Sequence, residues 1–275
     1  TLSITDQTRD KILAVADVLG YWEDHERPLG GKEIALLFRV TEQEQQNDVY
    51  FATLNKAIRK VLKQRQLHVK TYSDTEELID NADHHEGFIC VGANHLTMSE
   101  LSRLHKVLPA GVIIDTNPAP QYFDSVQPNL SLTVRNAFVQ LIENGFERIG
   151  FIGGQGLQIA DRPIMADSRT ATFKIVAEEY GMKDAPIFSS GTFTVENGRR
   201  IGQQIIERFG KIGLPDAFIC ASDTITVGVL QAFNEGGVLV PRDTSIISIN
   251  NSELAKYVSP PLTTYEINQP EMCRI

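Results

Sequence analysis

Two apolar segments in the second half of the chain decide the fold, Ala217-Phe-Ile-Cys-Ala221 and Ser245-Ile-Ile-Ser-Ile249. Each runs into a small polar cluster, Ser222-Asp223 after the first and Asn250-Asn251 after the second. Continuous apolar runs of this length are typical of parallel strands that are buried on both faces. Because open α/β sheets bind ligands beyond the carboxyl ends of such strands, the two polar clusters are expected to face a ligand.

Strand and helix patterns alternate along the chain from residue 34 and predict an α/β fold with parallel sheets. The expected strands occupy residues 34–38, 67–72, 88–91, 112–114, 149–152, 186–189, 218–221 and 245–249. The same order of elements occurs twice, which predicts two similar parallel-sheet lobes. Two such lobes, with loops at the carboxyl edges of their sheets, would close on a ligand between them.

Two connecting segments set the expected boundaries of the lobes. The first crossing is expected at residues 127–130, and the second at Ser259-Pro-Pro-Leu-Thr-Thr264, because paired prolines favour an extended segment that cannot continue a helix. The sequence therefore predicts a first lobe of residues 33–128 and 263–275 and a second lobe of residues 129–262.

The N-terminal segment, residues 1–32, differs from the rest of the chain. Thr5 is expected to cap a short helix that carries Ile12 and Val15 on its apolar side, and Gly20 is expected to end it. A single helix with a polar tail cannot bury a core. This segment is therefore expected to be the end of a small helical domain whose beginning is absent.

Length and composition exclude several classes of protein. A chain of 275 residues with 42% hydrophobic residues can bury one large or two modest cores, and it has no apolar stretch that could span a membrane. An export signal is not evident, and three cysteines fit a reducing cytoplasm. The formal net charge of −9 argues against a nucleic-acid surface on these residues, since phosphate contacts need clustered Lys and Arg. Any DNA contact must come from elsewhere.

Four stretches resemble one known family, in the correct order over nearly the whole chain. They are Leu2-Ser-Ile-Thr-Asp-Gln-Thr-Arg-Asp-Lys-Ile-Leu13 with Leu19-Gly-Tyr21, Arg148-Ile-Gly-Phe-Ile-Gly-Gly154, Ala221-Ser-Asp-Thr-Ile-Thr-Val-Gly-Val229 and Ser259-Pro-Pro-Leu-Thr-Thr264. The first resembles the end of the helix-turn-helix headpiece of the LacI/GalR family of bacterial transcription regulators. The other three resemble its regulatory core.

The resemblance implies a DNA-binding headpiece, a hinge, a core like that of periplasmic sugar-binding proteins and a homodimer formed along the flank of the core. It implies a small sugar effector between the lobes and operator DNA bound by a headpiece that is largely missing from this chain. Phe151-Ile-Gly-Gly154 and Ser248-Ile-Asn250 look most similar to galactoside-responsive members. Residues 22–31 depart from the family by lacking the pattern of the hinge helix.

Arg169 is the first candidate for effector binding. It lies one turn before Phe173 on an apolar helix stripe, at the start of a helix, where the dipole does not favour a cation. One interpretation is a surface ion pair with Asp167 or Asp161. The other interpretation, implied by the family, is that its guanidinium donates hydrogen bonds to sugar hydroxyls. We favour this interpretation because an unpaired Arg is rarely buried.

Three further candidates end strands. The family implies an effector-contacting acidic residue at Asp115, whereas an Asx turn would explain the same residue structurally, and both interpretations remain open. Asn250 and Ser222 stand where many members of the family have Asp and Asn. The amide of Asn250 can still donate and accept. Asp223 is expected to be the N-cap of the following helix.

The remaining candidates are placed by position. Phe193 follows the strand at 186–189, where the family offers an aromatic ring to a sugar, although a loop aromatic is more often a packing residue. Asp48, Tyr50 and Asn94 follow strands of the first lobe. Either Asn47 or Asp48 is expected to cap the next helix, and the apolar stripe of that helix would also explain Tyr50.

Metal, nucleotide and catalytic sites are not predicted. His84-His85 lies among acidic residues, but adjacent histidines usually face different ways, and a solvated loop is expected. Gly153-Gly-Gln-Gly156 follows a strand without completing a dinucleotide fingerprint. Because no nucleophile, base and acid converge in the sequence, we expect neither an enzyme nor a cofactor.

Two hypotheses remain. The leading one is a cytoplasmic transcriptional repressor whose operator affinity changes when galactose or a galactoside binds between the lobes. The alternative is the solute-binding protein of a sugar transporter with no DNA role, which would share the crevice but carry an export signal.

Overall fold

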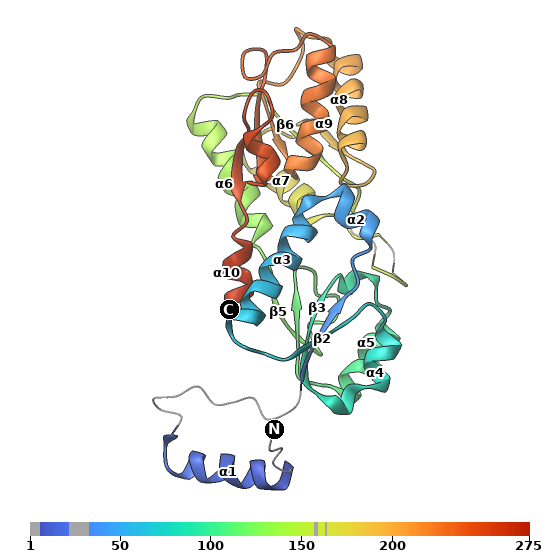
Figure 1. Ribbon diagram of the computed structural model, residues 1–275. Coiled ribbons are helices and arrows are strands. Elements are labelled where there is room, and N and C mark those ends of the chain that lie inside the picture. Colours follow the sequence, from blue (N-terminus) through green and yellow to red (C-terminus); the bar gives the residue numbers. More distant parts are fainter. Residues whose placement is uncertain (1–5, 22–32, 157–158, 163) are drawn as a thin grey trace.

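The computed structural model describes residues 6–21, 33–156, 159–162 and 164–275 (Figure 1). The strands are β1 Glu33–Phe38, β2 Val69–Tyr72, β3 His85–Val91, β4 Gly111–Ile114, β5 Asp124–Val126, β6 Ile149–Gly153, β7 Ile187–Ser189, β8 Ala217–Cys220, β9 Ser245–Asn250 and β10 Thr263–Glu266. The α-helices are α1 Asp6–Val18, α2 Glu42–Asn47, α3 Val49–Gln64, α4 Thr75–Asp80, α5 Met98–Val107, α6 Leu130–Glu143, α7 Ser168–Glu179, α8 Val195–Phe209, α9 Asp223–Glu235 and α10 Gln269–Arg274. Short 3₁₀ helices are η2 Ala82–His84, η3 Ala93–His95 and η4 Glu253–Lys256.

The two sheets have the same topology. The order of the first sheet is β2-β1-β3-β4-β5, and that of the second is β7-β6-β8-β9-β10, with all pairs parallel. Each sheet therefore follows the order 2-1-3-4-5 when its own strands are numbered along the chain. The α/β fold of two similar parallel-sheet lobes is confirmed, and we call them the first and second lobe.

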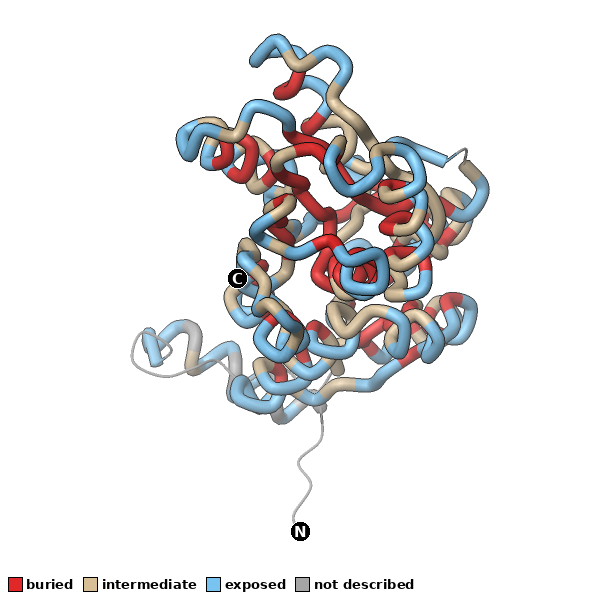
Figure 2. Tube along the Cα trace, turned by 90° about the horizontal axis from the view of Figure 1, so that it is seen from above, coloured by how far each residue is buried: buried red, intermediate tan, exposed pale blue. Residues whose placement is uncertain are grey.

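Each sheet is buried on both faces, as the continuous apolar strands predict. One apolar cluster extends over both lobes beneath α3, α6, α7 and α10. A second lies between the first sheet and helices α4 and α5, and a third between the second sheet and helices α8 and α9. Figure 2 shows buried backbone in the interior and exposed helix turns around it. Cys90 and Cys220 are buried in these cores, and burial raises the pKa of both thiols to about 12.

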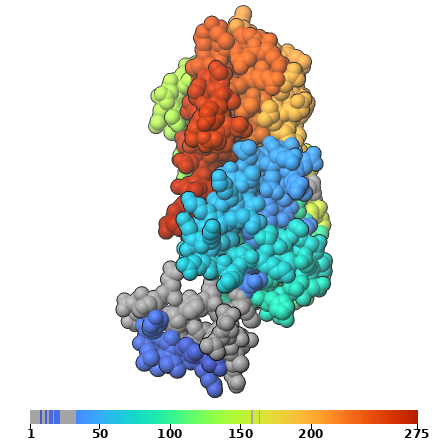
Figure 3. Space-filling view, viewed as in Figure 1, coloured from blue at the N-terminus to red at the C-terminus, as the bar shows by residue number. Residues whose placement is uncertain are grey.

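The chain crosses between lobes after the fifth strand of each sheet. After β5 it enters α6, which packs on α7 and β8, and after β10 it enters α10, which packs on α3. In Figure 3 the C-terminal segment forms a surface that runs from the second lobe to the first. The assignment of all of residues 263–275 to the first lobe was wrong, because β10 pairs with β9. It completes the second sheet as β5 completes the first.

Three local predictions differ from the structure or lie outside it. The prediction that His84 and His85 lie in a solvated loop holds only for His84, which is exposed. His85 is buried at the start of β3, and its Nε2 lies 2.7 Å from the Tyr72 hydroxyl. Thr5 and residues 22–31 lie outside the described residues. Within α1, Ile12 and Val15 are exposed.

Candidate functional site

A cavity of about 610 Å³ lies between the two lobes. It is lined by residues at or after the carboxyl end of every strand except β2, including Asp48 after β1, Asp115 after β4 and Asn250 at the end of β9. This is the edge at which parallel sheets bind ligands. All eight predicted effector-binding residues line it: Asp48, Tyr50, Asn94, Asp115, Arg169, Phe193, Ser222 and Asn250.

Asp48 and Tyr50 reach the cavity from the start of α3. The Asp48 carboxylate accepts from the backbone N–H of Tyr50 at 3.1 Å, so Asp48 rather than Asn47 caps α3. The Tyr50 hydroxyl donates to Asp115 Oδ1 at 2.9 Å. Tyr50 also packs against the apolar cluster, as the apolar stripe of its helix predicts.

Asp115 is held in an unusual backbone conformation at the end of β4. Its φ of +79° lies in the left-handed region, which Asp tolerates better than most residues. Burial raises the pKa of its carboxyl group, although the Tyr50 hydrogen bond and the Arg169 charge oppose that shift. The predicted Asx turn is not among its contacts: the Asp115 carboxylate accepts from Tyr50 and from the Thr116 hydroxyl at 3.3 Å.

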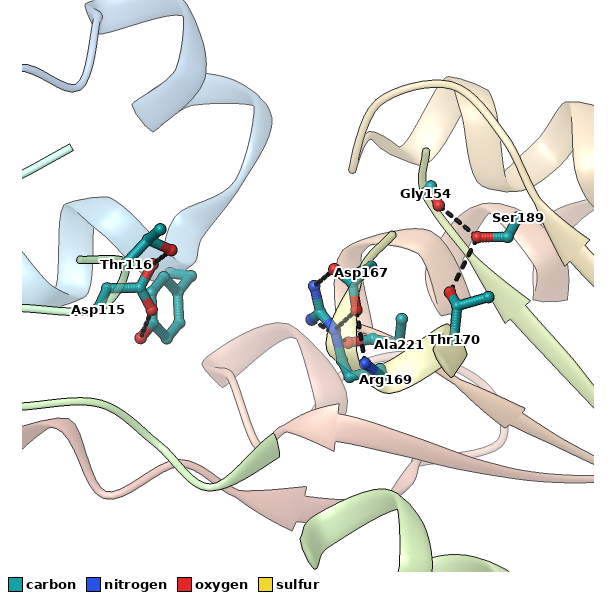
Figure 4. Close-up of polar contacts among 9 residues, drawn as sticks. Asp115, Thr116, Gly154, Asp167, Arg169, Thr170, Ser189 and Ala221 are labelled. Carbon is teal, nitrogen blue, oxygen red and sulfur yellow. Dashed lines mark hydrogen bonds and ion pairs between the residues drawn. The ribbon is translucent and has the colours of Figure 1, made fainter. Parts of the chain in front are cut away.

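Arg169 faces Asp115 from the opposite lobe (Figure 4). Its Nε and Nη2 donate to the two carboxylate oxygens of Asp167 at 2.8 and 2.7 Å, and Nη1 donates to the Ala221 carbonyl at 2.8 Å. Both Arg169 and Asp167 side chains are only 13% exposed, so the predicted ion pair exists but does not lie on the surface. Three of five guanidinium N–H groups are used, which leaves two without a partner among the described residues.

Phe193 and Asp167 fix the position of this arginine. The centroid of the Phe193 ring lies 4.6 Å from Arg169 Cζ, a cation–π distance. Asp167 also caps α7 by accepting from the Arg169 backbone N–H at 2.9 Å. Burial raises the pKa of Asp167, but hydrogen bonds and the charge of Arg169 outweigh this effect and leave it below the usual value.

Ser222, which lines the cavity, also takes the capping role that the sequence suggests for Asp223. Ser222 is the N-cap of α9, and its hydroxyl accepts from the Ile225 N–H at 3.3 Å. The prediction that Asp223 caps this helix was wrong. Its carboxylate accepts from the Ser252 N–H at 2.6 Å and the Thr264 hydroxyl at 2.7 Å, so it connects α9 to the segments on both sides of η4.

Asn250 and Asn94 also line the cavity. Asn250 has a φ of +121°, a rarely populated value that costs on the order of 1–3 kcal/mol and is typical of functional sites. Asn94 lies in η3, and its backbone carbonyl accepts from the Ala160 N–H of the second lobe at 2.9 Å.

Hydrogen bonds join the lobes at the edge of the cavity. The Thr224 hydroxyl of α9 donates to Asp48 Oδ1 at 3.1 Å, and Arg162 Nη1 donates to the Pro118 carbonyl at 3.3 Å. With the Asn94–Ala160 bond they hold the lobes in contact. Thr224 is buried and does not line the cavity itself.

Several lining residues were not predicted. They include Glu44, His95, Gln127, Gln155, Met165 and Thr192. Most lie in loops without a regular apolar pattern, so only their position after a strand could have indicated them. Among the described residues, no group of three or more His, Cys, Asp or Glu could hold a metal ion, and no helix could span a membrane.

The comparisons with known proteins agree on one family. Residues 138–275 match the family model of the periplasmic binding protein-like domain. The chain is 49% identical to the HTH-type transcriptional regulator LacR of Lactobacillus helveticus over 98% of this chain and 80% of the relative. It is 41% identical to the HTH-type transcriptional regulator GanR of Bacillus subtilis (strain 168) over 100% of this chain and 82% of the relative.

Solved structures share the fold at low identity. A LacI family transcriptional regulator from Lactobacillus casei with bound sucrose aligns with a TM-score of 0.70 and 20% identity over 88% of each chain. One from Arthrobacter in complex with lactose aligns with a TM-score of 0.70 and 18% identity over 88% of this chain and 86% of that one.

Proposed function

The chain belongs to the LacI family of HTH-type transcriptional regulators, and we propose that it is a repressor whose effector, galactose or a galactoside, binds in the cavity between its lobes. That it is a sugar-responsive regulator follows from the family. The effector, the sign of regulation and the binding residues belong to the proposal.

The observation that carries this proposal is the placement of Asp115 and Arg169 on opposite lobes of one cavity (Figure 4). A carboxylate accepts from two hydroxyls at once, and a guanidinium donates in a fixed plane. The Phe193 ring, which also lines the cavity, offers an apolar face. A sugar presents hydroxyls at its rim and C–H groups on its faces, so this combination suits it.

The name of one relative supports galactose or a galactoside among sugars. This relative, from Streptococcus thermophilus, is 31% identical over the whole chain and is named GalR. None of the three comparisons supports the alternative of a transporter component. The relatives are transcriptional regulators rather than enzymes.

The lobes supply a means of coupling sugar to DNA. A sugar that contacts residues of both lobes binds more tightly when the lobes are closed, and only such a difference in affinity can shift the arrangement of the lobes. We expect a homodimer, in which a change of lobe arrangement alters the spacing of two DNA-binding headpieces.

A thermal-shift screen tests the sugar-binding part of the proposal. We expect galactose or a galactoside to raise the melting temperature of the complete protein in a concentration-dependent way, since a ligand that binds only the folded state stabilises it. Glucose and maltose serve as comparison sugars. A melting temperature that no sugar changes would contradict the proposal.

A further inference from the structure

We infer that the cavity selects an uncharged sugar and rejects the phosphorylated form of the same sugar. This inference rests on the proposed function and narrows its ligand class. It derives from the charges that line the cavity and from the partners those charges already have.

Acidic groups outnumber basic groups on the cavity wall. The only guanidinium or ammonium group among the described lining residues is that of Arg169, and the only imidazole is that of His95. The same wall carries four carboxyl groups, those of Glu44, Asp48, Asp115 and Asp167. A phosphate ester carries up to two negative charges near neutral pH, so it would enter a wall with an excess of negative charge.

Both basic groups are already paired. Arg169 donates to both oxygens of Asp167, and His95 Nε2 lies 3.0 Å from Glu44 Oε1. Asp48 and Asp115 have only uncharged donors as hydrogen-bond partners among the described residues. The net effect on an incoming anion therefore comes from these two carboxyl groups, which a phosphate would approach without a compensating cation.

The N-termini of α3 and α7 at the cavity do not offset this excess, and those of α6, α8 and α9 are capped by the uncharged side chains of Asn129, Thr194 and Ser222. Helices α3 and α7 begin at the wall, where free backbone N–H groups would ordinarily attract a phosphate. Carboxylates already accept at both ends: Asp48 from the Tyr50 N–H, and Asp167 from the Arg169 N–H. At the N-termini of α3 and α7, the protein's own carboxylates therefore occupy the position that a phosphate would take.

An uncharged sugar meets the opposite situation. Its hydroxyls can donate to the carboxylate oxygens of Asp115 and Asp48, and can accept from the two N–H groups of Arg169 that have no partner among the described residues. The same residues that repel a phosphate thus have acceptors and donors for hydroxyls.

Calorimetric titration of the complete protein with matched ligand pairs tests the inference. The pairs are galactose with galactose 6-phosphate and lactose with lactose 6-phosphate. We expect at least one free sugar to bind and its phosphate to bind at least about 100-fold more weakly. A phosphate that binds as tightly as its free sugar overturns the inference and leaves the proposed function standing. If neither member of either pair binds, the proposed galactoside function itself fails.

Charge-removing variants test the cause. In Asp115→Asn the Tyr50 hydroxyl keeps an acceptor, and in Asp48→Asn the helix keeps a capping side chain. We expect each to reduce the ratio of the two dissociation constants at least about fivefold, whatever it does to the free sugar alone. Asp124→Asn, exposed on β5 outside the cavity wall, serves as the control and should leave the ratio unchanged. An unchanged ratio in both cavity variants would contradict the assignment.

Discussion

Arg169 shows how a buried cation can be stable and still available to a ligand. Asp167 neutralises it with two hydrogen bonds, Phe193 stacks against it and the Ala221 carbonyl accepts a third N–H. Buried ion pairs require such geometry, because desolvation otherwise exceeds the attraction of the charges. The arginine is thus held in place before any ligand arrives.

Arg169→Ala should remove the sugar response. We expect the sugar-induced rise in melting temperature to disappear, and the free energy of unfolding to fall by about 1–3 kcal/mol because Asp167 loses its partner. Arg135→Ala, which breaks the exposed pair with Glu179, is the matched control. It should cost no more than about 1 kcal/mol and keep the sugar response. A normal response in Arg169→Ala would show that this residue has only a structural role.

The carboxyl groups of Asp115 and Asp167 should give opposite pH dependences. Burial raises the folded-state pKa of Asp115, so its contribution to stability is greatest below the unfolded value of 3.8 and is lost as the pH rises through the folded value. The folded-state pKa of Asp167 is lowered, so its contribution is present above 3.8 and is lost as the pH falls through the folded value.

Urea denaturation at pH 3 and pH 7, an interval that spans the unfolded value of 3.8, measures this difference. Relative to wild type, Asp115→Asn should become more stable as the pH rises, because the variant no longer has to hold a buried charge. Asp167→Asn should become less stable over the same interval. If both variants shift in the same direction, the two carboxyl groups do not titrate as the geometry indicates.

Helices α8 and α9 cross at unusually short distance. A Cβ on Gly228 would lie 1.9 Å from the Val195 carbonyl oxygen, and one on Gly198 would lie 2.1 Å from the Ile225 carbonyl oxygen. These contacts are with backbone, which cannot move aside as a flexible side chain can. The close crossing positions the start of α9, where Ser222 and Thr224 lie.

Gly228→Ala should separate the two helices. We expect a loss of about 1–3 kcal/mol in the free energy of unfolding, as for other overpacked cores. Gln231→Ala, three residues further along α9 on its exposed side, should change it by less than about 0.5 kcal/mol. Equal denaturation midpoints for Gly228→Ala and wild type would mean that the helices can part without cost.

Thr224→Val should weaken sugar binding although Thr224 does not line the cavity. The variant loses the hydroxyl that donates to Asp48 across the lobes, which favours the open arrangement. We expect the dissociation constant for the effector to rise about 2- to 10-fold, the effect of one hydrogen bond. Thr224→Ser keeps a hydroxyl and should bind as wild type does. Unaltered affinity in Thr224→Val would show that this bond does not influence closure.

The elements that sequence predicts well are those with long apolar patterns. Eight strands are present as expected. Strand β5 was not predicted because two of its three residues, Asp124 and Ser125, are polar and exposed at a sheet edge. The place of β10 depends on its pairing with β9, a tertiary contact that local sequence does not encode.

The whole molecule repeats one sheet topology, and this repetition explains where the site lies. In each lobe the chain leaves after the fifth strand and enters a helix that packs in the other lobe. Both crossings pass the cavity, which Gln127 lines after β5 and Ile267 after β10. A change of angle between the lobes must therefore act on residues beside the ligand.

The candidate site could be placed from sequence because parallel strands deliver their following residues to one edge. Its individual contacts could not. The cap of α9 by Ser222 and the bidentate pair of Arg169 with Asp167 are local contacts that depend on side-chain geometry rather than on a sequence pattern. The bonds from Ser252 to Asp223 and from Arg169 to the Ala221 carbonyl join segments that are far apart in the chain. The bond from Thr224 to Asp48 joins the two lobes and has no local sequence pattern.

The central claim is that a sugar between the lobes changes the affinity for DNA. The most direct test is the dissociation constant of the complete protein for a duplex selected from random sequences for tight binding, measured with and without saturating galactoside. We predict at least about a fivefold weakening by the sugar, within the usual range of allosteric coupling, and no weakening in Arg169→Ala. A DNA affinity that stays the same in wild type, at a sugar concentration that demonstrably raises its melting temperature, would contradict the account.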